Sequence, residues 1–289
     1  MQAFRARRTK GVPLRLEAAW RLTADHPDFG GLSALSRYQG QLMAISDSGA
    51  LFSFSPSAAQ HRWPAQVSAL PKGCMASVMK ADRDSESLAV DPQAGRYWIG
   101  LESRNAICSV ASGEEGRLVQ PASMAKWKLT SGPEAMARLA DGRILVIAEQ
   151  SPTPSESVPA LLFDQDPIEN AEAVHALRYQ PPAGYAPVDV ASLPDGRLLI
   201  LHRAFRLPFE FSAVLSLGQL AETDGRWTLN ASPIAWFRDG RGRENWEALA
   251  VEDKGQGRAT IWMASDDNYL VLQSTYLLKL AWQGPSQPQ

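Results

Sequence analysis

The sequence is poor in the two residue types that most often bind transition metals. Among 289 residues there are two cysteines, Cys74 and Cys108, and four scattered histidines. Neither cysteine stands in a Cys-x-x-Cys pair or at a Cys/His spacing, which excludes zinc, iron–sulfur and disulfide-scaffold sites. The two cysteines could form one bridge in an oxidising compartment, or they could remain free, buried thiols.

Long apolar runs and a strong net charge are also missing. No apolar run approaches the ~20 residues that span a bilayer, so we expect no membrane span. The formal net charge of −2 gives no whole-molecule attraction for nucleic acid or for an anionic membrane. The basic N-terminus, residues 1–11, lacks the apolar stretch of an export signal and is expected to be a tail. The protein is then either cytoplasmic, or periplasmic or secreted after removal of a signal.

The familiar catalytic motifs are absent too. There is no G-x-S-x-G elbow, Walker loop, G-x-G-x-x-G or H-E-x-x-H motif. Lipase-like, nucleotide-binding and zincin chemistry therefore have no support in the sequence.

What the chain does contain is a short pattern that returns five times. An apolar run, a Gly-containing turn and a second apolar run begin at residues 30, 86, 134, 188 and 247, at intervals of 56, 48, 54 and 59. Two of the turns, Asp141-Gly142 and Asp195-Gly196, are strong hairpin signals. Short strands repeated at this period are typical of a β-propeller, in which small sheets surround a central axis.

The N-terminal run Leu14–Leu22 has no partner in its own repeat. If it completes the last repeat, the ring closes and two exposed sheet edges disappear. The sequence therefore predicts an all-β protein: a single β-propeller of five four-stranded blades over residues 12–283, followed by a C-terminal tail, 284–289. Six blades are the alternative, if the stretch 53–82 holds an additional sheet.

Acidic residues recur at two positions of the repeat. The starts of the first strands carry Glu86, Glu134, Asp189 and Glu247. The ends of the second strands carry Asp47, Glu102, Glu149 and the run Asp266, Asp267 and Asn268. Propeller geometry brings both positions to one mouth of the channel, together with Arg83, Arg104, Arg203 and Arg206. The fourth repeat differs, because His202-Arg203 ends its second strand.

Crowded carboxylates repel one another, and a bound cation or raised pKa values relieve the repulsion. Oxygen ligands of this kind suit calcium best, and the lack of nearby histidine and cysteine argues against zinc or copper. We therefore expect Ca²⁺ on Asp47, Glu102, Glu149, Asp189, Asp266, Asp267 and Asn268. In the same hypothesis Glu86, Glu134, Glu247 and His202 are catalytic, and the four arginines bind a small anionic substrate. Alternatively, the acids tie neighbouring blades together through backbone N–H groups or the arginines.

Several segments resemble a known family. They are Phe29–Leu35 with Ala44–Gly49, Asp84–Ala89 with Gly100–Ser103, Val188–Arg197, and Asn245–Ala250 with Ser265–Asn268. Over about residues 29–280 the chain resembles the bacterial phytase-like β-propellers, which are described as having esterase-like activity of phytase. The usual E-G-L pattern becomes Glu86-Ser-Leu88, Glu134-Ala-Met136 and Glu247-Ala-Leu249, so the acids stay while the glycines do not.

The resemblance implies a propeller, often exported, that hydrolyses phosphate or other esters. Together with the acidic mouth it predicts a calcium-assisted ester hydrolase, such as a phosphomonoesterase. Two alternatives use the same mouth: a non-catalytic propeller that binds a small molecule or peptide, and a calcium-dependent lactonase. The sequence gives no oligomeric state.

Overall fold

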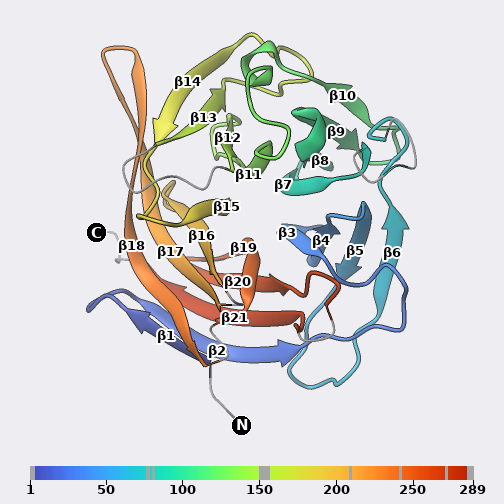
Figure 1. The fold of residues 1–289 in the computed structure, drawn as a ribbon, viewed down its shortest axis with the longest axis vertical. Coiled ribbons are helices and arrows are strands. Elements are labelled where there is room, and N and C mark those ends of the chain that lie inside the picture. Colours follow the sequence, from blue (N-terminus) through green and yellow to red (C-terminus); the bar gives the residue numbers. More distant parts are fainter. Residues whose placement is uncertain are drawn as a thin grey trace.

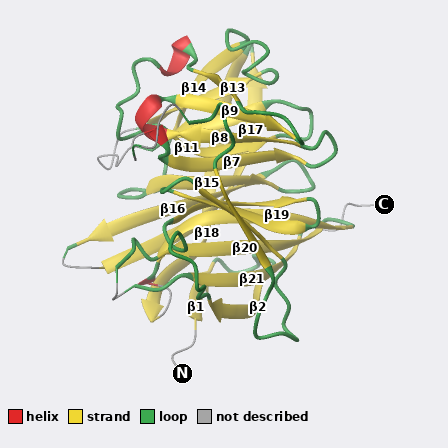
Figure 2. Ribbon diagram, turned by 90° about the vertical axis from the view of Figure 1, so that its right-hand side faces the viewer, coloured by secondary structure: helices red, strands yellow, loops and turns green. Residues whose placement is uncertain are grey.

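The computed structural model describes residues 4–75, 79, 82–149, 157–207, 210–240, 243–270 and 273–284. The protein is all-β apart from short 3-10 helices such as η2 (Glu102–Arg104) and η3 (Ala122–Met124). Its sheets surround a common centre in a propeller-like arrangement, with β3, β7, β11, β15 and β19 innermost (Figure 1). In the side view the strands lie in successive layers (Figure 2).

Three sheets are four-stranded and antiparallel. We name them unit 1, unit 2 and unit 5 by their order along the chain. Unit 1 contains β3 (Leu32–Tyr38), β4 (Gln41–Ser46), β5 (Ala50–Phe54) and β6 (Ala65–Ala69). Unit 2 contains β7 (Ser85–Asp91), β8 (Arg96–Leu101), β9 (Ala106–Ala111) and β10 (Arg117–Val119). Unit 5 contains β19 (Asn245–Gly255), β20 (Arg258–Asp266), β21 (Tyr276–Gln283) and β2 (Leu14–Arg21).

The remaining sheet has nine strands and consists of two antiparallel groups. Unit 3 contains β11 (Pro133–Arg138), β12 (Ile144–Ala148), β13 (Val158–Phe163) and β14 (Val174–Tyr179). Unit 4 contains β15 (Ala186–Ser192), β16 (Leu198–Arg206), β17 (Glu210–Thr223) and β18 (Arg226–Gly240). One parallel pair, Tyr179 with Leu229, joins the two groups.

The N-terminal segments cover strand edges. The predicted closure is confirmed: β2 pairs with β21 and becomes the outer strand of unit 5. Residues 4–8, which the sequence analysis assigned to a tail, form β1 (Phe4–Arg8) and pair with the edge of β18. Pairing satisfies backbone groups that an open edge would leave to solvent or to another chain.

The stretch 53–82 was the basis of the six-blade alternative. In its described part, residues 53–75, 79 and 82, it contributes the end of β5, then β6, and an isolated bridge between Lys72 and Met75. These residues form no additional sheet.

The core lies between neighbouring units. Ala34 of β3 shares a hydrophobic cluster with Leu88 of β7, and Ala89 of β7 shares the next cluster with Met136 of β11. An alanine on one inner strand thus belongs to the same cluster as a larger side chain on the following one. The small residues let the inner strands approach one another, which is the packing reason for the alanines of the repeat.

Cys74 and Cys108 form a disulfide, which decides between the two alternatives left by the sequence. Their Cα atoms are 5.4 Å apart, and both residues are fully buried. The bridge connects the segment after β6 of unit 1 to β9 of unit 2.

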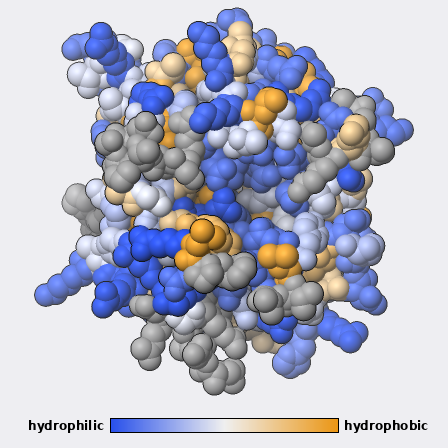
Figure 3. Space-filling view, in the orientation of Figure 1, coloured by the Kyte–Doolittle hydropathy of each residue, from blue (hydrophilic) through white to orange (hydrophobic). Residues whose placement is uncertain are grey.

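The outer surface is mainly hydrophilic, with scattered apolar residues on the face shown in Figure 3. Across the described ranges, no helix has the length and apolar character that crossing a membrane requires.

Candidate functional site

Each inner strand carries a β-bulge at the same place in its pairing with the second strand of its unit. The register shifts between Leu32 and Ala34, Ser85 and Ser87, Pro133 and Ala135, Pro187 and Asp189, and Trp246 and Ala248. The residues inside the bulges are therefore Ser33, Glu86, Glu134, Val188 and Glu247. A bulge removes one residue from the ladder and re-aims its side chain. Three of the five bulges place a glutamate in this way.

On the second strand of each unit, or just after it, one residue lies opposite the position two residues before the bulge. The N–H of Glu102 donates to Asp84 O at 2.9 Å, and the N–H of Glu149 donates to Gly132 O at 3.3 Å. The equivalent residues, one per unit, are Asp47, Glu102, Glu149, Arg203 and Asp266. The sequence left His202 and Arg203 equally placed at this position, and the register assigns it to Arg203.

We call the bulge glutamates, the equivalent strand-end residues and Asp84 the mouth cluster. Asp84, Glu86 and Glu102 each offer one carboxylate oxygen within 4.8 Å of the others. Glu102, Glu134 and Glu149 form a second group by the same measure. Glu102 belongs to both groups, so the carboxylates of units 2 and 3 are continuous.

Arg203 is the cation of the mouth cluster. Its Nη2 donates to Glu149 Oε1 at 2.8 Å, and its Nη1 donates to Glu247 Oε1. Asn245 accepts from the same guanidinium at 3.4 Å and donates through Nδ2 to Asp266 Oδ2 at 3.2 Å. One arginine and one asparagine therefore connect acids of units 3 and 5.

Burial and crowding act on the carboxyl groups of this cluster. Burial, followed by repulsion from Asp84 and Glu149, raises the pKa of Glu102 to about 7. Burial raises the pKa of Glu247 to about 8, although Arg203 acts in the opposite direction. Burial lowers the pKa of Arg203, but Glu247 and Glu149 outweigh this effect and raise it overall, so the guanidinium stays charged.

The pKa values of Glu86 and Glu134 are also raised well above the ordinary value. In both cases burial is the largest cause and neighbouring carboxylates add to it. Burial also raises the pKa of Asp266 to about 6. The cluster thus carries more acidic groups than it can ionise without an added cation.

His202 lies inside the protein and not at the mouth. It is fully buried, its Nδ1 donates to Val214 O at 3.1 Å, and Tyr179 Oη donates to its Nε2 at 2.7 Å. Burial lowers the pKa of His202 to about 4. Both ring nitrogens are therefore used in packing the neutral imidazole, in place of the catalytic role that the sequence pattern suggested. Adjacent residues of a strand point to opposite faces, which separates His202 from Arg203.

Asp189 ties two units together. It is 1% exposed, and its carboxylate accepts the N–H of Leu249 at 2.6 Å and of Val190 at 2.8 Å. Because Val188 occupies the bulge, Asp189 stands one residue beyond the position of Glu86. Its carboxylate thus joins β15 to β19, which is the alternative role considered for the acids, and not a position in the mouth cluster.

Asp267 and Asn268 shape the turn after β20. Asp267 Oδ1 accepts the N–H of Gly31 at 3.2 Å and of Tyr269 at 3.1 Å. Asn268 is exposed, and its side chain donates to Gln273 at 2.5 Å. Both therefore have turn-forming partners of their own.

Of the four predicted arginines, the structure brings Arg203 into contact with the mouth cluster. Arg104 lies 3.9 Å from Asp82. Arg83 is half-buried beside Gly49, and Arg206 is exposed at the end of β16.

Asn245 and two of the glycines near the bulges, Gly31 and Gly132, were not predicted as site residues from the sequence. At Gly132 a Cβ atom would lie 2.6 Å from the Cα of Glu102, so only glycine permits this approach. Gly31 has a φ of +58°, and a Cβ there would lie 2.4 Å from Asp47 Oδ1. A glycine two residues before the bulge, Gly31 in unit 1 and Gly132 in unit 3, was the available signal.

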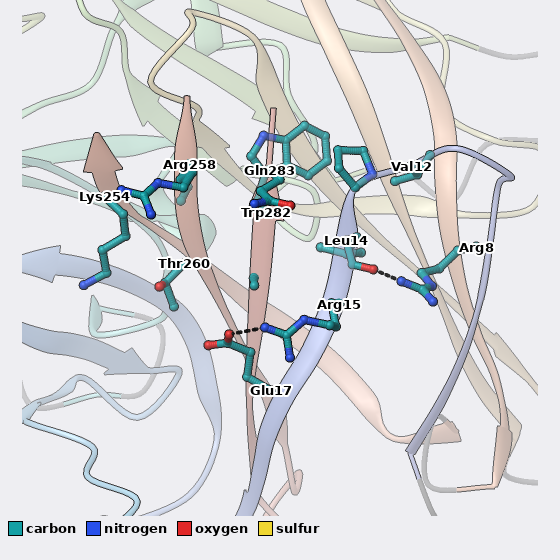
Figure 4. Close-up of a pocket in the computed structure, with 13 residues that line it drawn as sticks. Arg8, Val12, Leu14, Arg15, Glu17, Lys254, Arg258, Thr260, Trp282 and Gln283 are labelled. Carbon is teal, nitrogen blue, oxygen red and sulfur yellow. Dashed lines mark hydrogen bonds and ion pairs between the residues drawn. The ribbon is translucent and has the colours of Figure 1, made fainter. Parts of the chain in front are cut away.

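Two cavities lie away from the mouth cluster. One of about 320 Å³ is lined by inner-strand residues of every unit, from Leu35 to Asp253. The other, of about 410 Å³, lies beside β2 and β21 and is shown in Figure 4. There Arg8 bonds to Leu14 O and Arg15 pairs with Glu17 at 2.7 Å.

A family model described as phytase-like, esterase-like activity of phytase, matches residues 27–269. The chain belongs to this family. A search among curated protein sequences found no match.

Three of the solved structures that resemble this chain match it over most of both chains. A gluconolactonase from Xanthomonas campestris is 13% identical over 96% of this chain and 97% of that chain, with a TM-score of 0.49. A hypothetical protein from Leishmania major is 10% identical over 93% and 91%, with a TM-score of 0.48. A virginiamycin B lyase from Staphylococcus aureus is 11% identical over 90% and 98%, with a TM-score of 0.44. No substrate or metal for the phytase-like chain follows from these likenesses.

Proposed function

We propose that this phytase-like protein hydrolyses phosphate or other esters at the mouth cluster, with a divalent cation held by its carboxylates. We also interpret the nine-stranded sheet as two blades, units 3 and 4, which gives a five-bladed propeller. The family match supports the reaction class, and the crowding of carboxylates supports the cation.

The proposal of a bound cation depends on the surroundings of Glu134. Its side chain is buried, with 7% of the residue exposed, and within the described ranges its carboxylate makes no hydrogen bond or ion pair. It lies within 4.8 Å of oxygens of Glu102 and Glu149. Burying an unpaired carboxylate is costly, and a cation coordinated by the group removes this cost.

Calcium fits the donor set, because carboxylate and carbonyl oxygens are its usual ligands. Glu86, Glu102 and Glu134 would hold it, with Asp84 beside them. A cation bound there would supply a more acidic water and polarise the ester oxygen. Arg203 lies across the same mouth and is the group we assign to the anionic part of the substrate.

We further propose that the protein works in an oxidising compartment. The buried Cys74–Cys108 disulfide supports this, since such bridges persist mainly in exported proteins.

The test compares chelator-stripped and calcium-loaded protein, for the wild type and for Glu134→Gln. Calcium should raise the Tm of the wild type and permit release of phosphate from p-nitrophenyl phosphate or phytate. The Glu134→Gln variant should lose at least tenfold in calcium affinity and in turnover. Exposed Glu114 offers the matched control, and Glu114→Gln should behave as the wild type.

The same assay separates the alternatives. Calcium binding with no turnover of phosphate esters, carboxylate esters or lactones would indicate a non-catalytic binding propeller. Turnover of lactones alone would indicate a lactonase. No Tm shift with calcium would overturn the metal proposal.

A further inference from the structure

Unit 4 differs from the other units at both positions of the mouth cluster. Its bulge residue is Val188, where units 2, 3 and 5 have glutamate. Its strand-end residue is Arg203, where the other four units have an acid. Unit 4 therefore contributes a positive charge to a cluster that is otherwise acidic.

Arg203 does not pair with all the acids of the mouth cluster. On one side Arg203 is within ion-pair distance of Glu149 at 2.8 Å and also bonds to Glu247. On the other side, in the described part of the chain, Glu86 and Glu134 have no ion pair with any Arg or Lys. The mouth thus has one half whose acids pair directly with Arg203 and one half without a direct ion pair, where Arg203 acts only through space by opposing the raised pKa of Glu134.

The half without a direct ion pair is more than a group of acids. Glu134 is buried within it, and its carboxylate makes no hydrogen bond in the described structure, so a polar group without a partner is directed into the cluster. A guanidinium is always charged, and the side chain of Arg203 is fixed to the protein. A dissociable cation therefore cannot use the carboxylate oxygens that Arg203 already contacts. Two cations a few ångströms apart also repel each other, which disfavours an ion beside Arg203.

We infer that the mouth binds a single divalent cation in the half formed by Asp84, Glu86, Glu102 and Glu134, and that Arg203 replaces a second ion at Glu149 and Glu247. This inference rests on the proposed function, since it locates the cation that the function requires. In this arrangement Arg203 sets the number of bound ions. An anionic substrate would then lie between one metal ion and one guanidinium group.

Calcium binding to chelator-stripped full-length protein tests the inference without any substrate. Isothermal titration with CaCl₂ should give one ion per wild-type chain. Glu86→Gln should weaken binding at least tenfold. Glu247→Gln should weaken binding clearly less than Glu86→Gln does, because Glu247 pairs directly with Arg203 and does not contact the ion.

The stoichiometry of Arg203 variants gives the second readout. Arg203→Glu should bind two calcium ions, and the double variant Arg203→Glu with Glu247→Gln should return to one. Arg203→Lys should keep one ion. Near-UV circular dichroism in calcium establishes that each variant is folded. If Arg203→Glu does not fold, the comparison of Glu86→Gln with Glu247→Gln decides alone.

The outcomes distinguish the two proposals. If the wild type binds no calcium, the proposed function fails and the inference fails with it. If the wild type binds one ion but Glu247→Gln weakens binding as much as Glu86→Gln, only the inference is overturned. Two ions in the wild type, or one in folded Arg203→Glu, would overturn it as well.

Discussion

Two adjacent residues, His202 and Arg203, show how finely the site depends on register. His202 is fully buried against Tyr179, whereas Arg203 reaches the carboxylates of Glu149 and Glu247. The side chains of a strand alternate between its faces, so pairing of β16 with β15 decides which of the two enters the mouth. The sequence shows both residues at the strand end but does not contain that register.

The buried imidazole predicts a pH dependence of stability. Its pKa is lowered to about 4 in the folded protein, against 6.5 ordinarily. Between these pH values the unfolded chain binds a proton that the folded one does not. Stability is therefore lost as pH falls from about 6.5 to about 4, by up to roughly 3 kcal/mol from this group.

Urea unfolding at pH 7.5, 5.5 and 4.5 measures this effect. His202→Gln should flatten the loss relative to the wild type. Glu102 and Glu247 have raised pKa values, which favour folding as pH falls, in both proteins. The difference between the stability curves of the wild type and His202→Gln therefore reports the effect of His202 alone. His175, whose side chain is 40% exposed, bonds to Asp164, and His175→Gln should retain the wild-type slope. Parallel curves for wild type and His202→Gln would contradict the prediction.

At the scale of elements, bulges and edge strands decide what the repeat can do. The bulges aim Glu86, Glu134 and Glu247 at the mouth and leave Asp189 one residue out of step. The closing strand β2 was predictable, because an apolar run without a partner has to pair somewhere. The pairing of β1 with β18 was not, because its basic sequence shows no strand pattern.

The closing strand β2 gives a prediction in which a second residue of the same strand serves as the control. Leu14 of β2 is 1% exposed within the core, whereas Leu16 on the same strand is 40% exposed. Leu14→Ala should lower the free energy of unfolding by about 2–5 kcal/mol, because it leaves a cavity. Leu16→Ala should change it by about 0.5 kcal/mol or less.

Denaturant unfolding of the two variants measures the difference. Equal costs for Leu14→Ala and Leu16→Ala would show that β2 does not close unit 5 in the register described.

At the scale of the molecule, units distant in sequence hold one another in a ring. Hydrophobic cores lie between units, so each unit is stabilised by its neighbours, and the Cys74–Cys108 bridge ties units 1 and 2 together. The mouth is a product of this closure, because its carboxylates come from strands of different units.

The bridge predicts a redox-dependent stability. It encloses a sequence separation of 34 residues, for which the chain-entropy account gives about 4 kcal/mol. The double variant Cys74→Ala with Cys108→Ala should unfold at a clearly lower Tm than the oxidised wild type. Reductant should lower the Tm of the wild type and leave that of the double variant unchanged. A wild-type Tm that reductant does not alter, with thiol counting that shows reduced protein, would contradict this.

The sequence by itself determined the repeat, the hairpins, the closing strand and the acidic character of the mouth. These are local features, since strand period, Asp-Gly turns and charge are properties of neighbouring residues. Tertiary structure alone decided the rest: the disulfide, the burial of His202, the structural use of Asp189 and the contact of Arg203 with the acids of the mouth. Each of these depends on register and on contacts between units, and such contacts join residues that the sequence places far apart.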